Sequence, residues 1–155
     1  MDIKILSSED VFVNKRKIKA FVYESVKMSA YEASYSYDEA EQKVKELQTY
    51  IEQDSAIALG AFGDKGMTGF LWAYKYPYRE DTNRLYISIL HVSEEYRNME
   101  IGTELIRKIE SIAKEKGIDG VYLHAEATNN GACKFYEKMG FKRERIQFVK
   151  KYTGR

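Results

Sequence analysis

The segment Arg97-Asn98-Met99-Glu100-Ile101-Gly102-Thr103 has the composition of an anion-binding loop. It joins an apolar run of Tyr, Ile, Leu and Val to a stretch with helical periodicity, so the unpaired N–H groups of a helix N-terminus would point at a bound ligand. Arg97 adds a positive charge beside them. The chain contains neither G-x-x-x-x-G-K-[ST] nor G-x-G-x-x-G, which argues against the common nucleotide-binding loops. The pattern indicates either a pyrophosphate site or a plain connection with a glycine near a helix start.

A second segment follows further along the chain, with the spacing Asn129-x-x-Ala132-x-x-x-Tyr136-x-x-x-Gly140-Phe141. Together the two segments resemble the acyl-CoA-binding and acceptor-side motifs of the GNAT superfamily of N-acetyltransferases. The first motif of that family reads Arg/Gln-x-x-Gly-x-Gly/Ala, and Glu100 stands where the family usually has its first glycine. Taken without the resemblance, Asn129 would cap a helix and Tyr136 would be a core aromatic residue.

The resemblance implies an α+β fold with helices on both faces of a mixed, mostly antiparallel sheet, in which a central pair of parallel strands splays apart. It also implies acetyl-CoA as co-substrate, with its pantetheine arm along the strand Leu90-His91-Val92 and its phosphates at the loop. Tyr136 would lie beside the cofactor sulfur as a general acid. The implied cofactor-binding residues are Leu90, His91, Val92, Arg97, Asn98, Met99, Glu100, Ile101, Gly102, Thr103, Asn129 and Tyr136.

His124 is the candidate general base. Ribosomal-protein N-terminal acetyltransferases of this superfamily carry a glutamate five residues before the motif asparagine, and His124 holds that position relative to Asn129. A histidine with an ordinary pKa of about 6.5 can accept a proton at neutral pH. A structural role for His124 is the alternative. Some histone-acetylating relatives have a glutamate where this chain has Tyr86, so a base of that type is missing. The other histidine, His91, should face away from Leu90 and Val92, because successive side chains of a strand alternate between its two faces.

Several aromatic side chains could form an acceptor wall. The chain has 13 tyrosines, and residues 29–37 occupy the segment that forms part of this wall in the family. The predicted substrate-binding residues are Tyr31, Tyr35, Trp72 and Tyr74. The same rings could instead cover the sheet or form a homodimer contact.

Composition limits the alternatives. The 155 residues fit a single domain, 1–155, and 44% hydrophobic with 32% charged residues is ordinary for a globular protein. The net charge of +1 favours neither nucleic acid nor an anionic membrane. We find no run long enough to span a bilayer and no signal-peptide pattern. The one cysteine, Cys133, agrees with a reducing cytoplasm, and no metal-ligand spacing is present.

Hydrophobic periodicity and turn residues predict the elements that would position these groups. The N-terminal half should contain a strand at Ile3–Leu6, a helix from the capping residues Ser7–Asp10 to about Met28, and a second helix that begins with a capping box at Asp38–Glu41. The expected strands are Ala56–Phe62 and Met67–Tyr76, joined by a hairpin turn, then Tyr86–Val92, Val121–Ala125 and Phe148–Tyr152. The C-terminal helices should be Ile101 to residue 116 and Asn130–Met139.

The sequence therefore predicts an N-acetyltransferase that transfers acetyl from acetyl-CoA to a primary amine of a small molecule or a protein N-terminus by direct attack. The alternative is a non-catalytic acyl-CoA-binding module that senses or scaffolds. No metal, membrane or nucleic-acid partner is expected.

Overall fold

The computed structural model describes residues 1–28, 34–75 and 83–153. The chain forms two compact units, Met1–His124 and Ala125–Arg155. The single domain spanning residues 1–155 stays a prediction. The elements of the first unit are β1 (Asp2–Leu6), α1 (Ser8–Val13), α2 (Lys15–Lys27), α3 (Tyr37–Glu52), β2 (Ala56–Gly63), β3 (Gly66–Lys75), β4 (Arg84–Val92), the 3-10 helix η1 (Glu94–Tyr96), α4 (Ile101–Glu115) and β5 (Gly120–Tyr122).

The strands of the first unit form one mixed sheet in the order β1-β2-β3-β4-β5. The pairs β1–β2, β2–β3 and β3–β4 are antiparallel, whereas β4 and β5 are parallel. Asp64 and Lys65 turn the β2–β3 hairpin between the paired Gly63 and Gly66, and Gly66 has a positive φ of 110° that favours glycine. The mixed sheet and its parallel pair confirm the fold class expected from the sequence.

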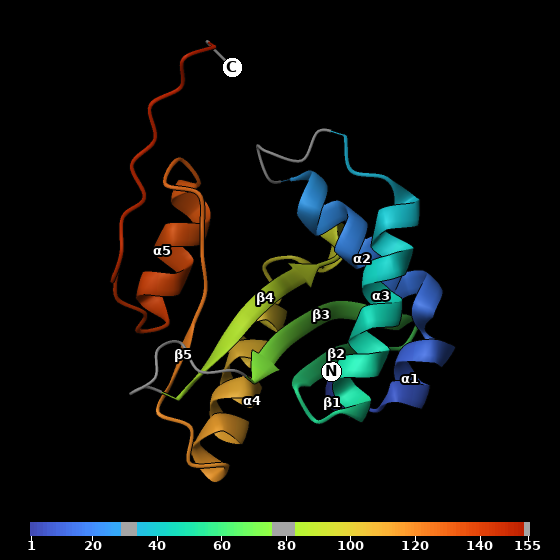
Figure 1. Ribbon diagram of the computed structural model, residues 1–155. Coiled ribbons are helices and arrows are strands. Elements are labelled where there is room, and N and C mark those ends of the chain that lie inside the picture. The colour runs from blue at the N-terminus through green and yellow to red at the C-terminus, as the bar shows by residue number, and fades with distance from the viewer. Residues whose placement is uncertain (29–33, 76–82, 154–155) are drawn as a thin grey trace. The chain divides into compact units, whose positions relative to one another are not determined.

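Helices cover both faces of this sheet (Figure 1). Helices α1, α2 and α3 pack together over one face, and α4 packs on the other. The predicted apolar stripe of α4 is buried, with Leu105, Ile106 and Ile109 fully so. On the opposite face Phe21 of α2 stacks with Phe70 of β3, at 6.3 Å between ring centroids. Burial on both faces accounts for the near-continuous apolar composition of β2 and β3.

The N-terminal helices differ from expectation in two places. The predicted helix up to Met28 is divided at Asn14, which has φ −99° and ψ 15°, so α1 and α2 are separate. The capping box is present at Ser7, whose hydroxyl accepts from the Asp10 N–H. Helix α3 is capped by Ser36 instead of Asp38, because the Ser36 hydroxyl accepts from the Glu39 N–H at 3.2 Å.

Strand β4 has an irregular register and one free edge. Ile87 pairs with Ala73 and Ile89 with Trp72, so Ser88 is an extra, exposed residue that forms a β-bulge. The pairing with β5 ends at Tyr86 and Tyr122. From Ile87 to Val92, β4 keeps β3 on one side, and no described strand of the first unit pairs with its other edge.

The second unit contains α5 (Asn130–Lys138). Asn129 caps it through a 3.0 Å bond from the Ala132 N–H to Oδ1. The strand expected at Phe148–Tyr152 is wrong: residues 141–151 have no regular secondary structure, and Phe148 and Tyr152 are about nine-tenths exposed. A strand requires a hydrogen-bonded neighbour, and the described part of this unit supplies only a helix. Strand β5 also stops earlier than expected, at Tyr122.

Candidate active site

The predicted anion loop lies between η1 and the N-terminus of α4. The Arg97 side chain donates from Nε to the Val92 carbonyl at 3.1 Å, which fixes the loop to the end of β4. Ile101 is buried while Arg97, Asn98, Met99 and Glu100 are exposed. The loop therefore connects η1 to the first turn of α4, where the N–H groups of Ile101, Gly102 and Thr103 have no partner within the helix.

Two residues of this loop have left-handed backbone conformations. Glu100, the N-cap of α4, has φ 62° and ψ 16°, and Asn98 has φ 66°. An asparagine adopts this region more readily than a glutamate. The Glu100 side chain makes no capping hydrogen bond, so nothing in the cap compensates the backbone strain. This strain is the physical consequence of a glutamate where the motif usually has glycine.

Close packing positions the start of α4 against the sheet. Gly69 of β3 pairs with Val92, and a Cβ atom at position 69 would lie 3.0 Å from Ile101 Cγ2 and 3.3 Å from Leu105 Cδ1. Glycine at this point lets α4 approach β3 closely. The anion loop is therefore held at both ends, by the Arg97–Val92 bond and by this contact.

His124 lies two residues after the end of β5, next to Tyr86 of β4. Its Nδ1 is 3.4 Å from the Tyr86 hydroxyl, and the two rings meet edge to face with 5.4 Å between centroids. His124 is exposed, whereas Tyr86 is half-buried. The Tyr122 ring stacks on Tyr86 at 5.0 Å. Burial first, and then Tyr122, raise the pKa of Tyr86 above its ordinary value of 10.0, so Tyr86 stays protonated at neutral pH.

Tyr86 is the residue that sequence reasoning missed. In the sequence, position 86 is notable only because it lacks the glutamate that some relatives have there. The signal that could have identified it is register: Tyr86 and Tyr122 are partners in the parallel pair, and His124 is two residues further on. Residues two apart on an extended chain share a face, so the β4–β5 pairing itself brings His124 to Tyr86.

The predicted residues of the second unit sit on and before α5. The Tyr136 ring is half-buried between Phe135 and Phe141, with 5.4 Å and 5.8 Å between ring centroids. Burial, with a smaller contribution from Cys133, raises the pKa of Tyr136 above 10.0. The Asn129 Oδ1 accepts the hydrogen bond that caps the helix. The two N–H donors of its side-chain amide are not used by that bond.

The predicted acceptor wall divides into buried and accessible rings. Trp72 is 1% exposed and Tyr35 is 7% exposed, and both belong to the core beneath α2 and α3. Tyr74 is half-buried and stacks on Tyr86 at 6.3 Å. Tyr31 lies outside the described residues. The role of all four residues in acceptor binding stays a prediction.

The remaining predicted residues follow the alternation of β4. Leu90 and Val92 pair with Leu71 and Gly69, and His91 pairs with Phe70 on the α2 face, as expected. His91 is buried, and its Nε2 lies 2.9 Å from Glu24 Oε2. The described residues contain no group of three or more His, Cys, Asp or Glu side chains that could hold a metal ion. No helix in the described ranges is long and apolar enough to cross a bilayer.

Part of the chain is similar in sequence to known N-alpha-acetyltransferases. The chain is 36% identical over 77 residues to N-alpha-acetyltransferase 50 of Danio rerio, an alignment that covers 49% of this chain and 45% of that protein. It is 42% identical over 65 residues to N-alpha-acetyltransferase 30 of Homo sapiens, covering 42% of this chain and 18% of that protein. The chain thus spans less than half the length of the curated relatives it matches.

A solved structure of an aminoglycoside acetyltransferase from an uncultured soil metagenomic sample has the same fold. Its TM-score is 0.74, its sequence is 22% identical, and the match covers 98% of both chains. A sequence model of the Acetyltransferase (GNAT) family matches residues 22–141, which include β4, the anion loop, His124 and Tyr136. The protein belongs to the GNAT acetyltransferase family.

Proposed function

We propose that this protein transfers the acetyl group of acetyl-CoA to a primary amine. The observation that carries the proposal is the edge of β4 from Ile87 to Val92, which no described strand of the first unit pairs with and which is followed, after η1 and the anion loop, by the N-terminus of α4. An extended ligand with amide groups can pair with such an edge like an additional strand, and its phosphates can accept from the first N–H groups of the helix. Pantetheine and pyrophosphate meet both requirements in one molecule.

Acetyl-CoA fits the residues present at this site. Arg97 and the N–H groups of Ile101, Gly102 and Thr103 would hold the phosphates. The backbone of Leu90 and Val92 would pair with the pantetheine amides, and an N–H near Val92 would polarise the thioester carbonyl. The acceptor nitrogen would attack that carbonyl carbon directly, forming the amide bond as the carbon–sulfur bond breaks.

His124 is the proposed general base, and Tyr86 is its positioning partner. In the tautomer with the proton on Nδ1, His124 donates to the Tyr86 hydroxyl oxygen and leaves the Nε2 lone pair for the ammonium proton of the acceptor. Tyr86 itself does not serve as the base, because its raised pKa keeps the hydroxyl protonated at neutral pH. The pair supplies both orientation and a proton acceptor, the arrangement that general-base catalysis requires.

Tyr136 is the proposed general acid. Its raised pKa keeps the hydroxyl protonated at neutral pH, so it can donate to the departing thiolate. Since the attack is direct, the protein needs no covalent intermediate. The proton removed from the amine and the proton given to sulfur pass through different side chains.

We further propose that the acceptor is the α-amine of a polypeptide. The support is the likeness to two proteins named N-alpha-acetyltransferases, which share 36% and 42% identity with this chain over their aligned parts. The half-buried rings of Tyr74 and Tyr86 give the acceptor an aromatic surface next to His124. A small-molecule amine is the competing acceptor class.

Thiol release from acetyl-CoA, measured across a panel of peptides, polyamines, amino sugars and amino acids, tests the function. We expect turnover with peptides that have a free N-terminus and none with the same peptides blocked at that amine. Turnover with amino sugars alone would overturn the acceptor class but keep the reaction. A melting temperature that millimolar acetyl-CoA leaves unchanged would overturn the cofactor assignment, because a ligand at a hundredfold excess over Kd adds about 2.7 kcal/mol.

A further inference from the structure

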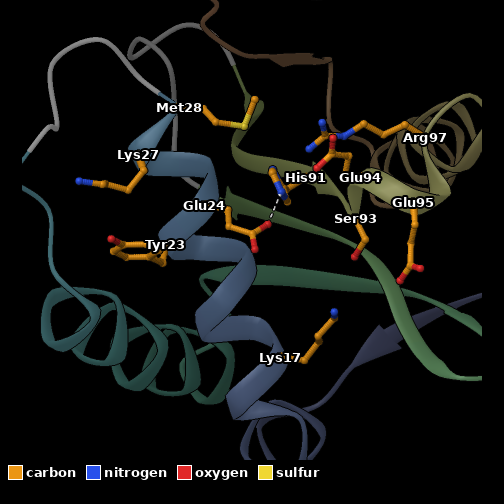
Figure 2. Close-up of a pocket in the computed structure, with 10 residues that line it drawn as sticks. All are labelled: Lys17, Tyr23, Glu24, Lys27, Met28, His91, Ser93, Glu94, Glu95 and Arg97. Carbon is orange, nitrogen blue, oxygen red and sulfur yellow. Dashed lines mark hydrogen bonds and ion pairs between the residues drawn. The ribbon is translucent and has the colours of Figure 1, made fainter.

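An open cleft of about 800 Å³ lies between α2 and the C-terminal end of β4 (Figure 2). One wall comes from the α2 side and consists of Lys17, Tyr23, Glu24, Lys27 and Met28. The other wall consists of His91, Ser93, Glu94, Glu95 and Arg97. The cleft therefore borders the strand and the loop that we assign to acetyl-CoA, on the face opposite α4.

The buried His91 in this cleft makes contacts that none of the roles proposed above accounts for. The His91 side chain is 6% exposed, and its ring lies 5.8 Å from the Phe21 ring of α2. Its Nε2 is 2.9 Å from Glu24 Oε2, the interaction drawn as a dashed line in Figure 2. The Glu24 side chain is 54% exposed and lies in the cleft, whereas its partner His91 is 6% exposed and lies in the core.

The contact between His91 and Glu24 is a hydrogen bond from a neutral donor to a charged acceptor. Burial lowers the pKa of His91 below its ordinary value of 6.5, and Arg97 lowers it further, while Glu24 raises it in part. The ring is therefore neutral at pH 7 and donates Nε2–H to the Glu24 carboxylate. Hydrogen bonds with one ionised partner are shorter and stronger than neutral ones.

The bond joins the strand that we assign to the cofactor to helix α2. His91 stands between Leu90 and Val92, whose backbone we assign to pantetheine. Glu24 is on the last turns of α2, which ends next to the segment that carries the predicted acceptor wall. An apolar side chain at position 91 would also pack on Phe21, but a hydrogen bond has a direction and so fixes how the strand lies against the helix.

We propose that Glu24 and His91 are a positioning pair that holds β4 in the geometry that binds acetyl-CoA. This inference rests on the proposed function, since it assigns the backbone on either side of His91 to the cofactor. Neither side chain touches the reacting atoms. Breaking the pair should therefore weaken cofactor binding while leaving the maximal rate nearly unchanged.

Three variants separate the bond from packing and from charge. His91→Phe keeps an aromatic ring against Phe21 and removes the bond. Glu24→Ala removes the partner, and Glu24→Gln keeps an oxygen acceptor without the charge. The matched control is Glu94→Gln, which removes one negative charge from the same cleft at a residue that has no hydrogen bond to His91.

The acetyl-CoA Kd, measured by calorimetry, is the main readout, with kcat, KM and the melting temperature beside it. We expect His91→Phe and Glu24→Ala each to raise Kd and KM by about five- to tenfold, with kcat within about twofold. The double variant should be no worse than the more affected single variant, because both remove one bond. Glu24→Gln should retain part of the affinity and Glu94→Gln all of it.

Three results would overturn the inference. These are an unchanged Kd in folded His91→Phe, additive effects in the double variant, or a rise in Kd that Glu94→Gln reproduces. If the wild-type protein fails to bind acetyl-CoA, the proposed function fails and this inference with it. Equal binding by the wild type and all variants contradicts the positioning pair alone.

Discussion

A histidine lies near each end of β4, and the surroundings of the two histidines differ. At the N-terminal end, the exposed His124 meets the hydroxyl of Tyr86 and can reach solvent. At the C-terminal end, the buried His91 is bonded to Glu24 and is followed by a strained loop. An accessible imidazole can exchange protons with a ligand, whereas an enclosed one is better suited to holding structure. We therefore expect variants at the first end to change kcat and variants at the second to change cofactor affinity and stability.

The largest effect is expected at Tyr136, on α5 of the second unit. Tyr136→Phe keeps the ring between Phe135 and Phe141 and removes the hydroxyl that would protonate the thiolate. We expect kcat to fall by about 10²–10⁴-fold with acetyl-CoA affinity unchanged. Steady-state kinetics and calorimetry measure the two quantities. A kcat close to that of the wild type would remove Tyr136 from the catalytic residues.

His124→Ala should have the next largest effect, a fall in kcat of about 10²-fold, and should flatten the acidic limb of the kcat/KM profile. That limb reports protonation of the base. Tyr86→Phe keeps the ring stack and removes the orienting hydroxyl, so we expect about a fivefold loss, as for one neutral hydrogen bond. If His124→Ala keeps the wild-type rate and acidic limb, His124 is structural and another group accepts the proton.

Local patterns predicted much of the fold because each depends on neighbours in sequence. The α4 stripe, the Gly63–Gly66 turn and the Ser7 cap follow from periodicity or from bonds within a few residues. The break at Asn14 did not follow, because no proline or glycine marks it and the tertiary packing of α1 and α2 decides the outcome. The strand expected at Phe148–Tyr152 depends on a partner strand, which no local pattern specifies.

The candidate site divides in the same way. The loop from Arg97 to Thr103 is contiguous, so its position after β4 could be predicted. The contact between Tyr86 and His124 joins residues 38 apart, and the bond between Glu24 and His91 joins residues 67 apart. The first contact depends on the register of β4 and β5, and the second depends on where α2 crosses the sheet. Glu24 had no sequence signal at all, since an exposed helical glutamate is ordinary.

His91 should also make stability depend on pH, with a smaller effect than the catalytic variants. Its pKa is lowered in the folded state, so below its ordinary value of 6.5 the unfolded state binds more protons than the folded state. The contribution of His91 to the free energy of unfolding is therefore fully present above pH 6.5. It declines as pH falls through the folded-state pKa, by no more than about 1.4 kcal/mol per pH unit for one proton. The charged or titratable groups that line the same cleft as His91 are Lys17, Tyr23, Glu24, Lys27, Glu94, Glu95 and Arg97.

Denaturant unfolding between pH 5 and 8 measures this dependence. His91→Phe should flatten the acidic decline, because phenylalanine has no proton to bind in either state. The same decline in the wild type and in His91→Phe would assign the pH dependence to other groups. The proposed positioning role would then be tested by the affinity measurements alone.

The smallest expected effect concerns the strain at Glu100. Glu100→Gly should raise the free energy of unfolding by about 1 kcal/mol, because glycine adopts φ 62° without the steric penalty that glutamate has. Part of that gain is offset because glycine has more freedom in the unfolded chain. The matched control is Asn98→Gly, at φ 66°, where asparagine already tolerates the left-handed region and the gain should be smaller.

The same pair of variants separates strain from charge in acetyl-CoA binding. If strain limits affinity, Glu100→Gly should tighten Kd equally at low and high salt. If the Glu100 carboxylate repels the phosphates, the gain should fade as salt is added, since exposed charges are screened over about 10 Å at 0.1 M. Asn98→Gly changes no charge, so its Kd should not respond to salt differently from the wild type. An unchanged Kd and unchanged stability in Glu100→Gly would show that the backbone at this N-cap is unstrained and its carboxylate irrelevant to the phosphates.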